Sequence, residues 1–533
     1  MTGGIIQLVA YGIENIYLNS DPQITFFKMV YRRHTNFSRE NIRLNFVQEK
    51  PDFGKIVSCK ITPEGDLVDG MSLVIRIPKI NSVVGEDGLV DAFGAQTSKY
   101  NRFAWARHLG HTLIKKIELE INGRVINCHY GEWLHIWNML VGPNNKGFDK
   151  SIGHIPELYD FTETKDEYLL NIPLQFWFCR NNGLALPMIA LKYSEININV
   201  EFNELKNCCI RTPTHYIVCD DSLVNFKKYE YIEQSVDNKL RCGLFVGYDV
   251  ITKRLYYQKL SKEKLVGIEY EGDETVLTPA QKNTIITSSS SQKYQINGND
   301  SKYSAMPDIN STSKTNYTSS ISYVSLNEAY LIVDYVYLDM EERLKIAKAK
   351  HDYLIEQVFF TPNSVIDGTN AKIKIHSNHP TKLLVWVTQS DEIINANDTF
   401  NYSDSHKRIR TENANKKVSI GDYTGKNMIN QETILLNGRE RLSFRSSSYF
   451  NYLQIYQHFE YNVSEGINAY SCALFPSAIQ PSGSCNTSQF ESVHVNIRLR
   501  YGLNNKHKIR FRSYSLGQNI LRIDGGLAAV LFE

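Results

Sequence analysis

Four histidines and one cysteine that could ligate a metal ion lie within a short stretch of the chain. Imidazole and thiolate are the ligands that zinc prefers. Their order, H-x-x-H followed later by C-H and a further His, matches no established zinc-finger or zinc-protease spacing. Aromatic neighbours at 130, 133 and 137 indicate a packed, partly polar loop instead of a metal site. The five residues are His108, His111, Cys128, His129 and His135.

Two pairs of adjacent carboxylates could perform acid–base catalysis. Asp220 and Asp221 lie in a segment without a recognisable motif. Glu341 and Glu342 lie where a helix is expected to begin, and the helix macrodipole favours negative charge there. We interpret both pairs as structural.

Two glycine-containing segments match catalytic or phosphate-binding motifs only in part. Gly421, Gly425 and Lys426 have the wrong spacing for a phosphate loop, and no Ser or Thr follows the lysine. Residues 481–486, PSGSCN, lack the second glycine of a nucleophile elbow and indicate a tight turn between strands. The sequence therefore predicts no catalytic residue, no cofactor and no metal ion, and a protein that is not an enzyme.

Basic residues gather near the C-terminal end. Lys508, Arg510 and Arg512 alternate with Ile509 and Phe511, so they share one face of an expected strand. Two interpretations stay open: a solvated strand face, or a basic face that meets an acidic protein or membrane surface. The whole group comprises Arg498, Arg500, Lys506, Lys508, Arg510 and Arg512.

The composition limits the class of protein. A chain of 533 residues is long enough for two or three domains, and 42% hydrophobic residues can form large cores. Its 59 Lys+Arg and 57 Asp+Glu leave a formal charge of only +2, which argues against a dedicated nucleic-acid binder. The 32 Tyr and 24 Phe favour β-structure.

The cysteine count and the N-terminal residues predict a soluble protein made in the cytosol. Nine cysteines without paired spacing are typical of reduced thiols. The start, MTGGIIQLVAYG, lacks the basic region of a secretory signal. No apolar run approaches the roughly 20 residues needed to span a bilayer.

Strict alternation of apolar and polar residues predicts antiparallel strands with one buried face. It occurs at residues 117–121, 196–202, 371–375 and 493–501. Asn122-Gly123 and Asn437-Gly438 are typical of tight hairpin turns. Residues 383–387, LLVWV, are apolar on both faces and predict a strand covered on both sides.

Only one segment strongly favours a helix. Asp339 is a candidate N-cap with Glu342 as its capping-box partner, and Met340, Leu344 and Ala347 follow at helical spacing. The segment lies between expected strands at 331–338 and 353–360. We therefore expect a short helix at a domain joint.

The polar stretch 287–325 is the clearest break in composition. Ser, Thr, Asn and Lys dominate it, and its apolar residues are too sparse to predict a core. It is either a mobile surface loop or an exposed projection that meets a host or a neighbouring subunit. Sequons, which without a secretory signal do not imply glycosylation, occur at Asn36, Asn299, Asn310, Asn316, Asn397, Asn401, Asn462 and Asn486.

Several motifs, in order from end to end, resemble one protein family. They are GGIIQLVA (3–10), PQITFFKMVYRRHTNF (22–37), PLQFWFCRNNGLALP (173–187), VDYVYLD (333–339) with its continuation to 357, QPSGSCN (480–486), and NILRI (519–523) followed by GGLA. Together they resemble the major capsid proteins of nucleocytoplasmic large DNA viruses, of the mimivirus and chlorella-virus type. The resemblance covers the whole chain.

The resemblance implies an all-β double jelly roll, with two eight-stranded antiparallel sandwiches and a short linking helix. It implies an N-terminal arm at 1–23, a first jelly roll at 24–342 and a second at 343–533. Residues 205–325 are then a long loop insertion between late strands of the first jelly roll. By analogy, the insertion would form an outward-facing tower.

The implied function is that of a major capsid protein, a structural subunit whose homotrimers form pseudo-hexagonal capsomers of an icosahedral virion. The implied partners are neighbouring capsomers, minor capsid proteins and the inner viral membrane, with glycans on outer loops and no specific nucleic acid. Assembly in the host cytoplasm would place the protein in the virion shell.

Two alternatives remain open from the sequence. A minor capsid or scaffold paralogue would share the fold, and abundance in purified virions separates it from a major capsid protein. A carbohydrate-binding or carbohydrate-cleaving β-sandwich would need exposed aromatic residues beside paired carboxylates. The sequence contains no recognisable motif of that kind.

Overall fold

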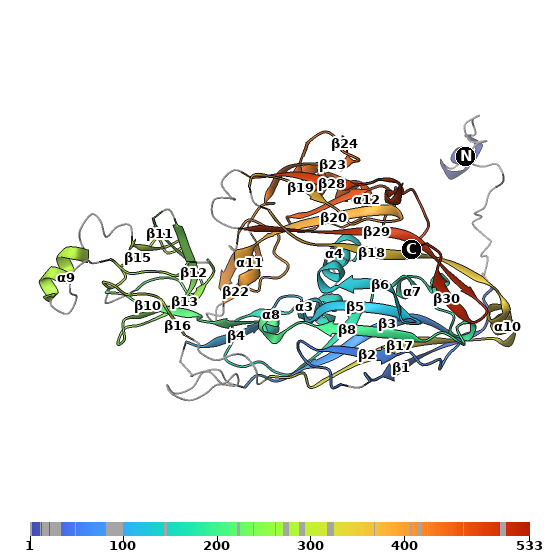
Figure 1. The fold of residues 1–533 in the computed structure, drawn as a ribbon, viewed down its shortest axis with the longest axis horizontal. Helices are drawn as coiled ribbons and strands as arrows, with labels where there is room; N and C mark the ends of the chain where they lie inside the picture. Colours follow the sequence, from blue (N-terminus) through green and yellow to red (C-terminus); the bar gives the residue numbers. More distant parts are fainter. Residues whose placement is uncertain are drawn as a thin grey trace.

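The chain folds into two β-sandwiches, one above the other in Figure 1, with a smaller β-unit extending from one end. The computed structural model describes residues 3–10, 12, 21, 33–47, 49–81, 100–142, 146–220, 224–237, 239–261, 263–269, 277–286, 294–316, 324–366, 368–405, 408–412, 418–423, 425–461, 463–500 and 508–532.

The first sandwich consists of two four-stranded antiparallel sheets around one core. One sheet contains, in spatial order, β1 (Phe37–Leu44), β17 (Glu328–Leu338), β3 (Leu67–Ile77) and β7 (Tyr168–Pro173). The other contains β2 (Ile56–Lys60), β8 (Ile196–Phe202), β5 (Ile114–Ile121) and β6 (Arg124–Tyr130). Burial alternates residue by residue along β8, as its sequence predicts.

The second sandwich repeats this plan. One sheet contains β18 (His351–Ile366), β29 (Ile509–Asp524), β20 (Pro380–Ser390) and β26 (Ile467–Ser471), with β27 (Cys485–Asn486) and β30 (Leu527–Val530) at its margins. The other contains β19 (Asn370–Lys374), β28 (Val493–Leu499), β23 (Ile429–Leu436) and β24 (Arg439–Glu440), with β25 (Arg445–Ser446) paired to β23.

Both sandwiches have the strand order of a jelly roll. When the eight main strands of each are numbered along the chain, one sheet has the order 1-8-3-6 and the other 2-7-4-5 in both sandwiches. This order arises from two Greek keys folded together. The predicted all-β double jelly roll is therefore confirmed.

The two Asn-Gly turns are also confirmed. Asn122 and Gly123 have φ angles of 52° and 79° between β5 and β6, and Asn437 and Gly438 have 48° and 78° between β23 and β24. Positive φ at both central positions is the geometry of a type I′ turn, whose twist matches that of the flanking strands.

The predicted linking helix is present as α10 (Met340–Lys348), between β17 and β18. The Asp339 carboxylate accepts a hydrogen bond from the Met340 N–H at 2.8 Å, and Arg343 pairs with Asp66 of the first sandwich at 3.0 Å. None of its residues is buried. The helix therefore connects the two sandwiches in the chain, but other residues supply their packing.

The expectation of one convincing helix is wrong, because residues 131–141 form a second one. Helix α4 (Gly131–Val141) occupies the segment that the sequence analysis interprets as a loop. Trp133, Ile136, Trp137 and Leu140 follow one another at helical spacing and are all buried. The other helices are short: α1 (Gly3–Val9), α3 (Leu109–Leu113), α5 (Lys146–Ser151), α6 (Pro156–Tyr159), α7 (Trp177–Arg180), α8 (Leu205–Cys208), α9 (Pro279–Ile286), α11 (Asp391–Asn395) and α12 (Gln454–His458).

The expected loop insertion is instead a folded unit, which we call the projection (residues 215–315). It lies in the chain between β8 and β17 and extends away from both sandwiches, in green in Figure 1. Its sheet contains, in spatial order, β15 (Ser304–Ala305), β14 (Ile296–Gly298), β11 (Tyr231–Val236), β12 (Lys239–Asp249), β13 (Arg254–Lys259), β10 (His215–Val218) and β16 (Lys314–Thr315). A two-stranded ribbon of β4 (Arg102–Trp105) and β9 (Cys209–Thr212) precedes it.

The projection has a hydrophobic core of its own, which includes Ile217, Phe245, Leu255 and Tyr257. The polar stretch contributes to this core through Ile296 and other buried residues of 294–316, so the expectation that it lacks a core is wrong there. Few apolar residues suffice because the strands at 215–259 supply most of the buried surface. Residues 287–293 and 317–323 of that stretch lie outside the described part.

Candidate functional site

The region with the most unusual chemistry is the joint, which we define as the contact between α4, β6 and α7 of the first sandwich and β18, β20 and β29 of the second. Its apolar part is formed by α4, whose Trp133 and Trp137 pack against Val385, Val387 and Tyr514. The ring centroids of Trp133 and Tyr514 lie 5.5 Å apart. Each fully buried aromatic side chain of this size stabilises the contact by several kcal/mol, at about 25 cal/mol per Å².

Strand β20 explains how one element serves two cores. Leu383, Val385 and Val387 face α4, whereas Leu384 and Trp386 face the interior of the second sandwich. Because successive side chains of a strand point to opposite faces, an uninterrupted apolar run satisfies both neighbours. The predicted two-sided burial of 383–387 is thus confirmed, and its cause is the joint.

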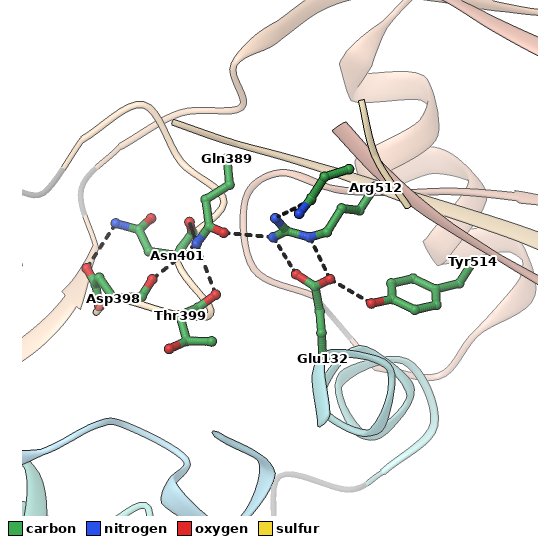
Figure 2. A network of polar contacts seen from close by, with 8 residues as sticks. Glu132, Gln389, Asp398, Thr399, Asn401, Arg512 and Tyr514 are labelled. Carbon is green, nitrogen blue, oxygen red and sulfur yellow. Dashed lines mark hydrogen bonds and ion pairs between the residues drawn. The ribbon is translucent and has the colours of Figure 1, made fainter. Parts of the chain in front are cut away.

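A buried ion pair crosses the joint beside α4 (Figure 2). The Arg512 guanidinium donates to both carboxylate oxygens of Glu132, at 2.7 Å from Nε and 2.6 Å from Nη2. Tyr514 Oη donates to Glu132 Oε2 at 2.7 Å. The side chains of Arg512 and Glu132 are only 11% and 13% exposed, so the pair is largely removed from solvent screening.

Gln389 extends this network to a loop of the second sandwich (Figure 2). Its Oε1 accepts from Arg512 Nη2 at 2.7 Å, and its Nε2 donates to the carbonyl oxygens of Asp398, Thr399 and Asn401 at 3.0–3.2 Å. Burial opposes the charge of Arg512, but Glu132 raises the pKa of the guanidinium. The arginine therefore stays charged and holds the loop and α4 together.

A second buried network crosses the joint at Glu356 of β18. Its carboxylate accepts hydrogen bonds from Arg180 of α7 and from Lys382 of β20. Lys382 is 2% exposed, and burial lowers the pKa of its ammonium although Glu356 acts in the opposite direction. The Arg180 guanidinium also lies over the Trp137 ring at 5.0 Å, which adds a cation–π contact to the apolar part of the joint.

Side-chain amides join the edges of β6 and β18. Asn127 Nδ2 donates to the Glu356 carbonyl at 2.9 Å, and its Oδ1 accepts from the Val358 N–H at 3.1 Å. Gln357 Nε2 donates to the Ile126 carbonyl at 2.6 Å. Each bond is directional, so together they specify the orientation of one sandwich relative to the other.

The structure brings together three of the five candidate metal ligands. The His108 ring lies 4.5 Å from that of His135 and stacks on His154 at 3.8 Å, and His111 lies 6.2 Å from His135. His129 instead stacks on Phe176, and burial lowers the pKa of His111 and of His129 to about 3. In the part of the chain that the structure describes, no group of three His, Cys, Asp or Glu side chains is arranged to hold a metal ion.

The other candidate residues have structural surroundings. Asp220 pairs with Lys253 of the projection at 3.4 Å, and Asp221 lies outside the described residues. Glu341 and Glu342 lie in the first turn of α10. Gly483, in the expected PSGSCN turn, has a φ of 123°.

The basic residues do not form one solvated or partner-binding face. Arg512 belongs to the joint, and Arg510 pairs with Asp391 at 2.5 Å. Arg498 lies over Phe444 and Arg500 lies 3.8 Å from Asp404, while Lys506 lies outside the described residues. Arg512 is neither solvated nor available to an external acidic partner, because it is buried against Glu132 of α4.

Glu432 of β23 is a buried carboxyl that the sequence analysis does not single out. It is 0% exposed, its Oε2 accepts from Trp386 Nε1 at 2.7 Å, and burial raises its pKa to about 8. The carboxyl is thus mainly protonated at neutral pH. No sequence signal separates it from an exposed glutamate, since β23 has polar residues on either side.

Glu432 should make the stability of the folded protein fall as the pH rises through neutrality. A pKa raised from 4.5 to about 8 means that its stabilising contribution is complete below pH 4.5 and is lost as the pH rises to about 8. We expect the melting temperature of the wild type to fall relative to that of Glu432→Gln between pH 5 and pH 8. Above pH 8 the difference between the two melting temperatures should stay constant. Differential scanning fluorimetry checks this. Parallel pH profiles would contradict the assignment.

Two further observations concern the surface. Within the described residues, no helix is long and apolar enough to cross a membrane. The sequon residue Asn401 is 1% exposed, so it does not lie on an outer loop that could carry a glycan.

Two family models match most of the chain. "Major capsid protein N-terminus" matches residues 25–242, and "Large eukaryotic DNA virus major capsid protein" matches residues 342–529. The chain is 40% identical to "Probable capsid protein 4" of Acanthamoeba polyphaga mimivirus, across 100% of this chain and 99% of that protein. It is 27% identical to the major capsid protein of Phaeocystis pouchetii virus, across 100% of both chains.

Solved structures show the same fold. A quasi-atomic model of the PBCV-1 virus capsid superposes with a TM-score of 0.61, covering 96% of this chain and 100% of that chain at 21% identity. The Faustovirus major capsid protein gives a TM-score of 0.63, covering 96% and 94% at 11% identity. With two jelly rolls in one chain, both family models matched in order and a full-length relative at 40% identity, the chain belongs to the major capsid protein family of large eukaryotic DNA viruses.

Proposed function

We propose that the protein is a non-enzymatic structural subunit, three copies of which form one capsomer of a virion shell. The observation that carries this proposal is the repetition of one strand order in two sandwiches that the joint fixes side by side. Three such chains around an axis present six similar sandwiches, so the trimer has a near-hexagonal outline. A closed ring of three repeats one heterologous contact three times.

Exposed apolar side chains on the second sandwich support contact with other copies. Tyr452, Tyr456, Leu474 and Phe475 are 49%, 83%, 66% and 64% exposed. The His458 ring hydrogen-bonds the Leu474 carbonyl at 3.0 Å and so ties the two segments into one surface. Contiguous exposed apolar surface on a folded chain marks an interaction site. We assign it to the contact between subunits or between neighbouring capsomers.

The N-terminal arm, residues 1–23, is proposed to contact minor capsid proteins or the inner viral membrane. Four apolar side chains of α1 support this, since Ile5, Ile6, Leu8 and Val9 are 49–83% exposed. We further propose that the protein assembles in the host cytoplasm. Exposed sequons such as Asn310 of the projection would carry glycans.

Light scattering of the purified full-length protein tests the trimer. We expect a monodisperse particle with about three times the 61.2 kDa mass of the chain, because obligate interfaces of this kind bury roughly 2,000 Å² or more. A stable monomer across micromolar concentrations would contradict the proposed function.

A second candidate function is that of a minor capsid paralogue. It is favoured by one comparison, since the relative at 40% identity is named "Probable capsid protein 4" rather than a major capsid protein. Quantitative mass spectrometry of purified virions separates the two. A major capsid protein is the most abundant polypeptide of the particle, whereas a paralogue of minor abundance is present at a small fraction of that level.

A further inference from the structure

Cys472 and Cys485 flank an exposed loop of the second sandwich, residues 473–484. We call the position of these two cysteines the neck of the loop. β26 and β27 both pair with the same edge of β20, and the loop leaves the sheet between them. The Cys472 N–H donates to the Lys382 carbonyl at 2.9 Å, and Cys485 is paired with Thr381. The two cysteines therefore face consecutive residues of one strand, although twelve loop residues separate them in the chain.

This register places the two cysteines within reach of each other. Their partners Thr381 and Lys382 are adjacent in β20, and both cysteines line the same cavity, so they lie on one side of the sheet and next to each other along its edge. A disulfide requires a Cα separation of roughly 4.4–6.8 Å. The Cys485 thiol is close enough to contribute to the raised pKa of Cys472, and both cysteines are free thiols in this structure. Neither residue is fully buried, and both line a cavity of about 280 Å³. A small oxidant therefore has access to the pair.

The loop itself is held in one shape. The Leu474 N–H donates to the Ser482 carbonyl at 3.1 Å, and the Phe475 N–H donates to Ser482 Oγ at 2.9 Å. A Cβ atom at Gly483 would lie 3.0 Å from the Cys472 carbonyl oxygen, so a residue without a side chain allows the two ends of the loop to approach closely. A covalent bond at the neck is thus compatible with the loop as it stands.

The loop also touches both features already described. The Ala478 carbonyl accepts a hydrogen bond from Lys382 of the joint at 3.2 Å. Leu474 and Phe475 form part of the exposed apolar surface assigned above to contacts between copies. A bond across the neck would limit how far this surface can move relative to the joint.

We propose that Cys472 and Cys485 form an intrachain disulfide when the protein passes from a reducing to an oxidising environment. The oxidant is a low-molecular-weight disulfide of the glutathione type. One cysteine thiolate attacks it and displaces one thiol. The second cysteine then attacks the mixed disulfide and displaces the other thiol. Two protein thiols and one small disulfide thus become one protein disulfide and two small thiols, and no other redox partner is needed.

The pairing depends on the geometry of the loop neck and not on the proposed capsid function. Burial and the neighbouring thiol raise the pKa of Cys472 to about 12, so the step in which Cys472 reacts should be slow at neutral pH and should accelerate in mild alkali. In the reducing cytosol the loop stays unlinked. In a released particle, the linked loop would hold the apolar surface in place.

The test uses the folded full-length protein, incubated with oxidised glutathione, alkylated without reduction and digested with trypsin. Both cysteines lie in one tryptic peptide, residues 446–498, because no Lys or Arg separates Arg445 from Arg498. We expect this peptide to escape alkylation and to be about 2 Da lighter than the reduced form. Chymotrypsin, which can cleave after Leu474, should leave the two halves of this peptide joined until a reductant is added.

Cys485→Ser is the informative variant, since it should restore alkylation of Cys472. Cys128→Ser is the matched control, because Cys128 is also partly exposed but lies in the first sandwich. This variant should leave the disulfide intact. Full alkylation of Cys472 and Cys485 in the wild type, or glutathione retained on either one, would overturn the proposal, and the light-scattering mass would be unaffected by that outcome.

Discussion

Replacing Glu132 with alanine is expected to lower the free energy of unfolding by about 3–5 kcal/mol, the cost of leaving a buried charge without its partner. Arg512 is 11% exposed and donates two short hydrogen bonds to this carboxylate. Tyr514 loses its acceptor in the same variant. Urea denaturation followed by tryptophan fluorescence measures the effect, and Trp133 and Trp137 place the probe at the joint.

An exposed ion pair supplies the control. Asp352 and Arg522 also form a bidentate pair, at 2.8 and 2.9 Å, but their side chains are 45% and 40% exposed. Asp352→Ala is expected to change the free energy of unfolding far less than Glu132→Ala, since solvent screens exposed charges. The double variant Glu132→Leu/Arg512→Met should recover most of the loss, because it removes both buried charges. Equal effects at Glu132 and Asp352 would contradict a role for burial.

The second large effect is expected from Trp133→Ala, which should destabilise the protein by about 3–5 kcal/mol through the loss of buried surface and the cavity left behind. Trp133 is 2% exposed and lies between Trp137 and Tyr514, with ring centroids 5.5 Å away on both sides. Because the cavity would lie between the sandwiches, the variant should also become more sensitive to protease. Thermal denaturation and limited proteolysis with mass spectrometry check both effects.

Tyr456→Ala is the matched aromatic truncation at an exposed position. Its side chain is 83% exposed, so the stability of the single chain should change by no more than about 0.5 kcal/mol. If Trp133→Ala were as mild as Tyr456→Ala, α4 would not hold the sandwiches together, and the joint would have to depend on the polar networks alone.

Local patterns in the sequence predict several of the main strands correctly. Alternation of apolar and polar residues at 196–202 and 493–499 indicates a strand with one buried face. The Asn-Gly pairs indicate a turn with positive φ, which few other residues adopt. These signals depend only on residues that are close in sequence, so they do not require knowledge of the tertiary contacts. The end-to-end motif resemblance then supplies the order of strands, which periodicity alone does not contain.

The joint could not be predicted in the same way. Glu132 and Arg512 are 380 residues apart in the chain, and neither lies in a motif. A signal for α4 does exist, because Trp133, Ile136, Trp137 and Leu140 have helical spacing. The neighbouring histidines and aromatics suggested a polar loop instead. The fold of the projection was missed because its late strands are only two or three residues long and depend on a core made elsewhere.

Single-particle cryo-electron microscopy of the purified full-length protein would show whether the joint builds a rigid two-sandwich subunit for a trimeric capsomer. We expect a particle with threefold symmetry, six sandwich densities in a near-hexagonal ring, and three projections. Within each subunit, α4 should lie against β20 as it does here. Monomeric particles, or a threefold particle whose sandwiches have separated at the joint, would contradict this expectation.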